Sequence, residues 1–398
     1  MTCKVKKALR LYKSWRNNAP YTVELLVSSL CNLRCIMCNV WKLAKNNPSV
    51  TDEELSISEY ENLLDELSSL GTKVISISGG EPLLKKGIFS IIQKAKEKDL
   101  QVQIITNGTI ISNAVATRLV ESGIDLITFS IDAPKAHIHD QIRGIPGSWE
   151  KATRALMMLN VLRRQSGSQR LRLAINFQIT RTNYHMIPEM IDLKSKLGFD
   201  EIRFLPIIGK TPAAQELFLG IEDLRWLREN LGSIKAKMDS KNLPTSNLAP
   251  LSSICNDIQN TIEGRYFICN MTLPEKTKRE ILCFAACIQA TIDPFGNVYP
   301  CCFACEFQNL SEDLTHSFWG DEDFSMGNLR QKSFKEIWYG ERFDRFRKKC
   351  QDPPSFLMCR YCGYDFSWYL ILTGLLKRRT ILLRYLYGGA RAFLQDLA

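Results

Sequence analysis

Residues 22–38 read TVELLVSSLCNLRCIMC, a mostly apolar run followed at once by three closely spaced cysteines. The run predicts a buried strand at 22–28, and Cys31, Cys35 and Cys38 predict a loop at its carboxyl end. Three thiolates can bind three irons of a four-iron cluster and leave the fourth iron open to another ligand. Structural zinc is the competing interpretation, but such zinc sites use four ligands, and no His or further Cys lies close by in the sequence.

The pattern of a short β-branched run followed by a helical stretch repeats up to about residue 207. We expect strands at 22–28, 73–78, 101–106, 125–131, 172–180 and 201–206, and helices at 57–70, 88–98, 113–122, 149–164 and 186–197. Strands that alternate with helices form a parallel sheet, and right-handed crossovers curl it into a barrel or part of one. The predicted fold class is therefore α/β, a partial (β/α)6 parallel barrel with a small cysteine-rich C-terminal domain.

The distinctive residues of this region each follow a predicted strand. Cys31 follows the first strand, a Gly-Gly-Glu-Pro segment at 79–82 the second, Asn107 the third and Asp132 the fourth. The carboxyl ends of parallel barrel strands share one rim, where active sites of such folds lie. We therefore expect these segments to meet around one site.

The C-x3-C-x2-C loop, followed by Gly-Gly-Glu-Pro after the second strand, resembles the radical S-adenosylmethionine (SAM) superfamily over residues 22–207. The resemblance implies a 4Fe–4S cluster on the three cysteines of the loop. It also implies that SAM is bound by Gly79, Gly80, Glu81 and Pro82, with further contacts from Asn107, Ser130 and Arg143. Glycines let a backbone approach closely, and a guanidinium group can pair with the SAM carboxylate. The alternative for Asn107, Ser130 and Arg143 is an ordinary loop residue bonded to backbone or solvent.

The same resemblance implies a reaction. An electron donor such as flavodoxin or ferredoxin would reduce the cluster, which would then reduce SAM to methionine and a 5′-deoxyadenosyl radical. That radical would abstract a hydrogen atom from the substrate, while the barrel orients the reactants and excludes water.

A second group of cysteines lies near the C-terminus of this chain, which has 14 cysteines in all. Cys283, Gly296, Cys301 and the pair Cys359 and Cys362 resemble the SPASM or twitch-type extension of radical SAM enzymes. The resemblance implies a hairpin that turns at Gly296 and one auxiliary 4Fe–4S cluster on the four cysteines. Two auxiliary clusters would need further cysteines after Cys362, which the sequence lacks.

The auxiliary ligand set leaves alternatives open. Cys287 competes with Cys283, and Cys302 competes with Cys301. Two spare thiols also compete, namely Cys305 and Cys350. A zinc knuckle would suit four such cysteines as well.

The remaining segments are a basic N-terminal segment (1–21), a bridging segment (208–282), the cysteine-rich domain (283–365) and a basic amphipathic tail (366–398). The formal net charge is +10, but much of the excess lies at the two ends, so nucleic acid is not expected as a partner. The N-terminus lacks the apolar core of a signal peptide, and no apolar run is long enough for a transmembrane helix, so we expect a cytoplasmic protein. The tail fits either docking on its own domain or peripheral contact with an anionic membrane.

Two classes of function fit these features, a radical enzyme and a non-catalytic metal-binding scaffold. A scaffold needs neither an open iron nor a SAM segment, so the sequence favours the enzyme. Its substrate can be a sugar-like alcohol, a cofactor precursor or a ribosomally made peptide. Residues 1–21 are too few for a peptide-recognition domain, which disfavours the peptide.

Overall fold

The structure, a computed structural model, describes residues 14, 17–167, 170–207, 212–248, 285–302, 304–305 and 324–351. Within these residues the strands form one sheet in the order β6-β5-β4-β3-β2-β1-β7-β8-β9. The strands are β1 (Thr22–Leu26), β2 (Val74–Ser78), β3 (Gln101–Thr106), β4 (Leu126–Ser130), β5 (Arg172–Ile179), β6 (Glu201–Pro206), β7 (Gln289–Ile292), β8 (Asn297–Tyr299) and β9 (Gly327–Asn328). Strands β1 to β6 pair in parallel, each with the next in the chain.

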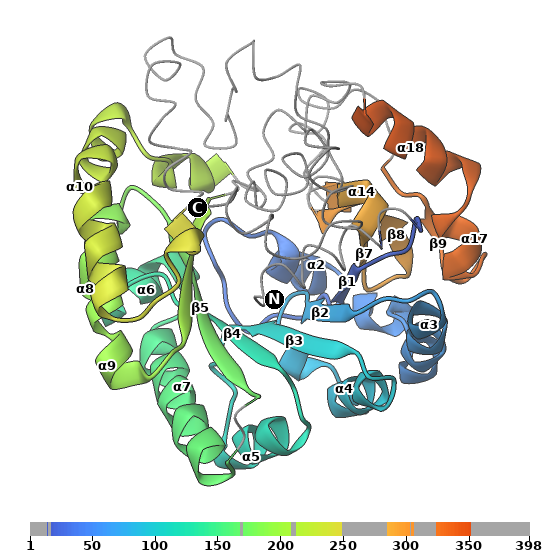
Figure 1. The fold of residues 1–398 in the computed structure, drawn as a ribbon, viewed down its shortest axis with the longest axis horizontal. Coiled ribbons are helices and arrows are strands. Elements are labelled where there is room, and N and C mark those ends of the chain that lie inside the picture. Colours follow the sequence, from blue (N-terminus) through green and yellow to red (C-terminus); the bar gives the residue numbers. More distant parts are fainter. Residues whose placement is uncertain are drawn as a thin grey trace, which may run out of the picture.

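Helices cover the outside of this curved sheet, with α3, α4, α5, α7, α8 and α10 arranged around it (Figure 1). The helices are α2 (Val40–Asn46), α3 (Ile57–Ser69), α4 (Ile88–Glu97), α5 (Asn113–Glu121), α6 (Ala136–Arg143), α7 (Ser148–Gln165), α8 (Ile187–Asp192), α9 (Lys194–Leu197), α10 (Ile221–Ser240), α14 (Ala285–Ile288), α17 (Phe334–Trp338) and α18 (Glu341–Gln351). In the described part of the chain, none of them has the length and apolar character that crossing a bilayer requires.

The six predicted strands and the parallel α/β fold are confirmed. Four of the five residues of β4 are buried, which is typical of a parallel strand covered on both faces. Helix α3 begins as the sequence pattern predicts, because the Ser56 hydroxyl accepts from the Glu59 backbone N–H and the Glu59 carboxylate accepts from the Ser56 N–H.

Two elements differ from the prediction. Residues 136–143, for which no helix was expected, form helix α6, which is only eight residues long and so shows little period in the sequence. It ends at Gly144, whose φ of 72° closes the helix in the left-handed region. The helix predicted at 186–197 is divided into α8 and α9 at Leu193, where φ and ψ are −62° and −14°.

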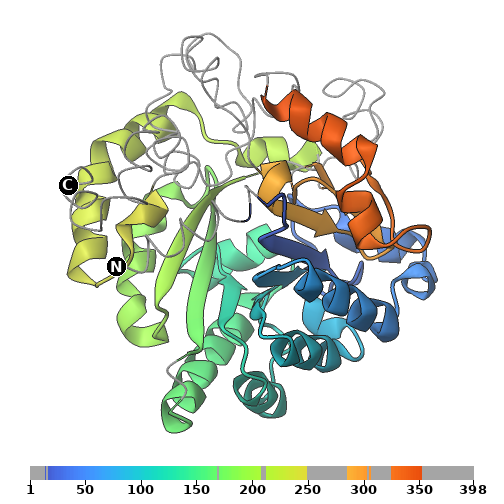
Figure 2. The ribbon, with the colours of Figure 1, turned by 45° about the vertical axis from the view of Figure 1, so that its right-hand side comes forward.

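The C-terminal hairpin extends the barrel sheet instead of standing apart from it. Strand β7 pairs in parallel with β1, and Figure 2 shows the two side by side. Strand β8 returns antiparallel to β7, and Gly296 between them has a φ of 88°, so the predicted hairpin turn is confirmed. β1 is therefore paired on both edges, by β2 and by β7.

A small aromatic core lies in residues 324–351, within the segment that was expected to be a cysteine-rich domain. Trp338 is fully buried, and its ring centre lies 5.8 Å from that of Phe334 and 4.7 Å from that of Phe343. The Arg347 guanidinium lies 4.4 Å from the Trp338 ring centre, and the indole N–H donates to the Asn18 carbonyl at 2.7 Å. Trp338 thus connects the C-terminal helices to the segment that precedes β1.

We expect Trp338→Ala to lower the free energy of unfolding by about 3–5 kcal/mol, because it leaves a cavity and removes the bond to Asn18. The matched control is Tyr339→Ala at the next position, which is 44% exposed and should cost less than about 0.5 kcal/mol. Urea unfolding of both variants measures the difference. Equal losses in the two variants would contradict the assigned packing.

Candidate functional site

The three cysteines of the triad lie on one loop after β1. Cys35 is buried, and Cys31 and Cys38 are half-buried. The loop is held at the end of α6, because the Arg34 N–H donates to the Arg143 carbonyl and the Ile36 N–H to the Ile142 carbonyl, both at 3.0 Å. The loop is therefore fixed at the carboxyl rim of the sheet, where the sequence placed it.

The chemistry of this loop fits an iron–sulfur cluster. Burial raises the pKa of Cys31 to about 12 and also raises the pKa of Cys35, with the neighbouring thiols adding to both shifts. The Arg143 guanidinium opposes the rise in the pKa of Cys35. Thiols with raised pKa values stay protonated near neutral pH, whereas a bound metal centre deprotonates them and becomes their partner. In the described residues no three His, Cys, Asp or Glu side chains converge as ligands of a single metal ion. A four-iron cluster distributes three thiolates over three irons, so its ligands stand further apart.

The glycine segment after β2 packs directly on the loop that leads to Cys31. The Gly80 N–H donates to the Ser28 carbonyl and the Glu81 N–H to the Leu30 carbonyl, both at 2.7 Å. A Cβ on Gly80 would lie 2.1 Å from the Leu30 carbonyl oxygen, so no other residue fits there without displacing the backbone. Gly79 has a φ of 131° and a similar close contact with Ser28. These glycines bring the predicted SAM segment against the cysteine loop.

Glu81 points into the protein and joins two rim loops. It is fully buried, and its carboxylate accepts from the Thr106 hydroxyl and the Asn107 N–H at 2.8 Å and from the Leu83 N–H at 3.1 Å. Burial raises its pKa to about 7, although these hydrogen bonds oppose the rise. The carboxylate thus ties the loop after β2 to the end of β3, and Pro82, also buried, begins the short 3₁₀ turn at Pro82–Leu84.

Asn107 connects the third strand to the cysteine loop. Its amide donates to the Asn32 side-chain oxygen at 2.9 Å, and its own oxygen accepts from the Thr109 N–H at 2.9 Å. Asn32 lies between two cysteines of the triad. Whether the amide also reaches SAM stays a prediction.

Ser130 and Arg143 lie on the same rim. Ser130 is the last residue of β4 and is half-buried. The Arg143 Nε forms an ion pair with the fully buried Asp132 at 2.7 Å, and its Nη1 lies 3.8 Å from the Cys35 sulfur. The structure therefore places Arg143 between the cysteine loop and a buried carboxylate, and its pairing with the SAM carboxylate stays a prediction.

His139 was not among the site residues that the sequence predicted. It is buried in α6, and its Nδ1 accepts from the Asp132 N–H at 3.1 Å. Burial lowers its pKa to about 4, so the ring is neutral near pH 7 and can accept this bond. Glu54 and Lys85 were also missed, and they form a buried ion pair at 2.8 Å beside the cysteine loop.

The auxiliary cysteines are only partly described. Cys301 and Cys302 follow β8 and are half-buried, while Cys287 and Cys305 are buried. Cys283, Cys359 and Cys362 lie outside the described residues, as does the side chain of Cys350. The assignment of Cys283 and Cys301, in preference to Cys287 and Cys302, as ligands of the auxiliary cluster therefore stays a prediction.

We expect Gly80→Ala to displace the loop before Cys31, because its Cβ cannot stand 2.1 Å from a carbonyl oxygen. SAM binding, measured by equilibrium dialysis on reconstituted protein, should weaken by about tenfold or more. The control is Gly232→Ala in α10, where nothing lies within 4 Å of the added Cβ and SAM binding should not change. Unchanged SAM affinity in Gly80→Ala would contradict the close packing of the two loops.

The sequence is similar to those of several known enzymes. The chain is 27% identical to the AdoMet-dependent heme synthase of Methanosarcina barkeri, over 87% of this chain and 89% of that protein. It is 24% identical to the PqqA peptide cyclase of Granulibacter bethesdensis, over 85% of this chain and 78% of that one. With the mycofactocin maturase MftC of Mycolicibacterium smegmatis it shares 25% identity, over 87% and 76% of the two chains.

Solved structures share the fold. Streptococcus suis SuiB superposes with a TM-score of 0.59 at 17% identity, covering 94% of this chain and 78% of that one. Residues 25–164 match the model of the radical SAM superfamily, and residues 283–363 match that of an iron–sulfur cluster-binding domain, SPASM. The family binds SAM and 4Fe–4S clusters, as the sequence predicted. The chain belongs to the radical SAM superfamily and carries a SPASM domain after its radical SAM domain.

Proposed function

We propose that this enzyme cleaves SAM reductively at a 4Fe–4S cluster held by Cys31, Cys35 and Cys38, and that the resulting 5′-deoxyadenosyl radical abstracts a hydrogen atom from an organic substrate. The observation that carries the proposal is the contact between the two rim loops, in which Gly80 and Glu81 bond to Ser28 and Leu30 just before the first cysteine. When bound, the cluster supplies the electron that SAM cleavage needs. Three cysteines leave one iron free for SAM, which a non-catalytic scaffold would not need.

The residues of the chain bind and orient SAM around that free iron. Gly79 and Gly80 give the backbone room for close approach, as their contacts with Ser28 and Leu30 indicate. Ser130 at the end of β4 and Arg143 at the end of α6 lie on the same rim and are proposed as polar contacts. Glu81, Pro82 and Asn107 would act mainly by holding the rim loops in place, since Glu81 is fully buried and Asn107 is bonded to the cysteine loop.

For the SPASM domain, proposed over residues 283–365, we propose one auxiliary 4Fe–4S cluster on Cys283, Cys301, Cys359 and Cys362. It would either accept an electron from the substrate radical, which would make the overall reaction an oxidation, or hold the substrate in place. The position of the hairpin supports a location of this auxiliary cluster near the barrel, because β7 pairs with β1, the strand that leads to the triad.

Two substrate classes follow from the relatives, a tetrapyrrole as in the heme synthases and a peptide as in PqqA peptide cyclase and the mycofactocin maturases. The match covers 89% of the heme synthase of Methanosarcina barkeri but only 78% of the PqqA peptide cyclase. We therefore propose a cofactor precursor as the first candidate and a precursor peptide as the second. Both can be tested with the same isotope experiment, described below.

An acidic redox protein such as flavodoxin or ferredoxin is the proposed electron donor, and α2 is its proposed contact. This helix has no buried residue and begins two positions after the last cysteine of the triad. Trp41 donates to the Cys35 carbonyl at 3.4 Å, and the cationic groups of Arg34 and Lys42 lie 5.2 and 5.6 Å from its ring centre. A positive face close to the cluster loop complements an acidic donor.

We propose a cytoplasmic location, since clustered cysteines suit a reducing compartment. Contact of the tail (366–398) with a membrane stays a prediction, and the tail lies outside the described residues. The N-terminal segment (1–21) and the bridging segment (208–282) likewise stay proposed divisions of the chain.

Anaerobically reconstituted enzyme should contain about eight irons and, with dithionite and SAM, should release 5′-deoxyadenosine. Cys38→Ala should abolish that release, whereas Cys359→Ala with Cys362→Ala should keep some SAM cleavage but lose product. Deuterium transfer from labelled tetrapyrrole or peptide candidates into 5′-deoxyadenosine would identify the substrate class. Wild-type enzyme with a full, reducible cluster and no SAM cleavage would contradict the proposal.

Charge reversal on α2, as Lys42→Glu with Lys45→Glu, should lower SAM cleavage driven by reduced flavodoxin by about tenfold at low salt. The ratio of the flavodoxin-driven rate to the dithionite-driven rate is the measure, because dithionite needs no docking surface. Reversal of an exposed arginine far along the chain, Arg225→Glu in α10, serves as the control. An unchanged ratio would exclude α2 as the donor contact.

A further inference from the structure

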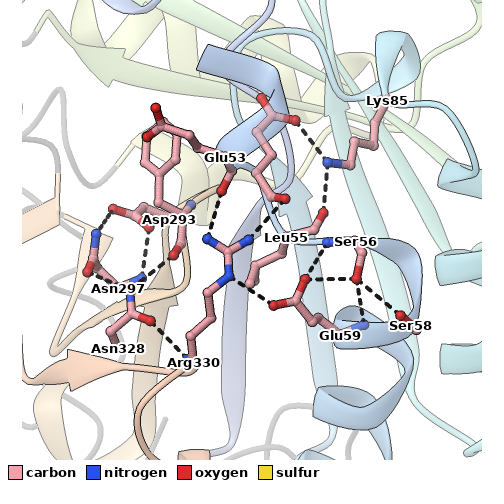
Figure 3. Close-up of polar contacts among 12 residues, drawn as sticks. Glu53, Leu55, Ser56, Ser58, Glu59, Lys85, Asp293, Asn297, Asn328 and Arg330 are labelled. Carbon is pink, nitrogen blue, oxygen red and sulfur yellow. Dashed lines mark hydrogen bonds and ion pairs between the residues drawn. The ribbon is translucent and has the colours of Figure 1, made fainter. Parts of the chain in front are cut away.

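Residues 53–59 lie between the C-terminal hairpin and the loop before the cysteine triad, and both sides form polar contacts with them. Figure 3 shows the contacts that Arg330 and Lys85 make with this segment. This segment comprises the end of the 3₁₀ turn Val50–Glu53 and the first turn of α3. None of its residues was assigned a role by the sequence. Its contacts nevertheless form a continuous path from the SPASM domain to the radical SAM site.

Arg330, which follows β9, holds the segment from the C-terminal side. Its Nε donates to the Glu59 carboxylate at 3.0 Å, its Nη1 to the Glu53 carbonyl at 2.9 Å and its Nη2 to the Glu54 carbonyl at 3.2 Å. All three guanidinium nitrogens are therefore bonded to residues 53–59. A lysine ammonium could not reproduce this planar arrangement.

The hairpin fixes Arg330 and also contacts the segment itself. The Arg330 N–H donates to the Asn328 side-chain oxygen at 2.9 Å, and the Asn328 amide donates to the Phe295 carbonyl at 3.0 Å. The Leu55 N–H donates to the Pro294 carbonyl at 2.7 Å, in the turn of the hairpin. Leu55 is fully buried, and the segment is therefore held on both sides of Glu54, by the hairpin turn at Leu55 and by Arg330 at Glu53.

Glu54 carries the path to the cysteine loop. One carboxylate oxygen accepts from the Ser29 N–H at 2.7 Å and from the Ser29 and Ser28 hydroxyls at 2.8 and 3.1 Å. The other pairs with Lys85 at 2.8 Å, just after the predicted SAM segment. Ser28 is also the residue whose carbonyl accepts from Gly80. The Glu54 side chain therefore fixes the backbone immediately before Cys31.

The Arg330–Glu59 pair by itself adds little stability, because its side chains are 44% and 36% exposed. Arg330 matters more because it fixes the positions of the Glu53 and Glu54 carbonyls. Those carbonyls set the direction in which the buried Glu54 side chain leaves the backbone. The buried Glu54 carboxylate has no water to replace its partners if its direction changes. A shift of the backbone at residues 53–54 would therefore displace Ser28 and Ser29, to which the carboxylate is bonded.

We propose that Arg330 is a positioning residue of the radical SAM site, acting through the backbone of residues 53–54 and the carboxylate of Glu54. The inference rests on the proposed function, because it takes the triad loop and the Gly80 loop as the place where the cluster and SAM bind. It makes the order of the C-terminal hairpin a condition for tight SAM binding. The SPASM domain thus contributes to the first site through a side chain that does not touch SAM.

The test compares Arg330→Ala and Arg330→Lys with Arg345→Ala, which removes an exposed arginine of α18 in the same domain. SAM affinity is measured by equilibrium dialysis on the full reconstituted chain, together with the change that SAM causes in the electron paramagnetic resonance signal of the reduced protein. We expect both Arg330 variants to bind SAM about fivefold or more weakly and to show a smaller spectral change, with Arg345→Ala like wild type.

A second variant tests the route. If Arg330 acts through Glu54, then Glu54→Gln alone weakens SAM binding, and adding Arg330→Ala to it weakens binding little further. Fully additive losses would overturn the route through Glu54. The inference would be overturned if the Arg330→Ala variant bound SAM with wild-type affinity and spectrum. A loss of stability or faster proteolysis of that variant would then show that Arg330 has a structural role alone. Wild-type protein that binds no SAM would overturn the proposed function and this inference with it.

Discussion

The loop after β1 is partly buried although it is neither helix nor strand, and the site depends on the hydrogen bonds that its backbone groups form. Buried amide and carbonyl groups without hydrogen bonds are costly, and several of those in this loop find their partners in other segments of the chain. The backbone N–H groups of Gly80 and Glu81, in the loop after β2, donate to the carbonyls of Ser28 and Leu30. The carbonyls at the end of α6 accept from the N–H groups of Arg34 and Ile36. The cysteine positions are thus set by neighbours that come from other units of the barrel.

This requirement explains why several charged side chains near the site face inward. Glu81 and Glu54 both accept backbone N–H groups of rim loops, and the Asp132 carboxylate accepts from the Gln178 N–H at 3.0 Å. Each carboxylate joins two segments that are far apart in the sequence, and buried carboxylates are stable only with such partners. The polar shell behind the rim is therefore a scaffold for the loops, and the chemistry is left to the cysteines and the groups at the surface of the rim.

Much of the fold followed from the sequence, because period and strand signals are local. The six strands, the start of α3 at Ile57 and the turn at Gly296 each depend on residues within a few positions of one another. The triad and the glycine segment were recognisable for the same reason. The side chains that hold the rim loops in place could not be recognised in the sequence, because their partners are distant in the chain. Glu54 and Ser29 are 25 positions apart, and Arg330 and Glu59 are 271 positions apart. Helix α6 escaped prediction since eight residues give too few turns to show a period.

The pairing of β1 with β7 has a consequence for how the two parts of the enzyme work together. A separate cysteine-rich domain on a linker would move relative to the barrel, whereas β7 shares a hydrogen-bonded edge with the strand that leads to the triad. Trp338 adds a second connection, to the Asn18 carbonyl just before β1. β1 therefore receives contacts from the C-terminal part at its start, along its edge and, through residues 53–59, at its end. A strand held at all three places transmits a displacement of the hairpin to the cysteine loop instead of absorbing it, because close-packed elements deform little.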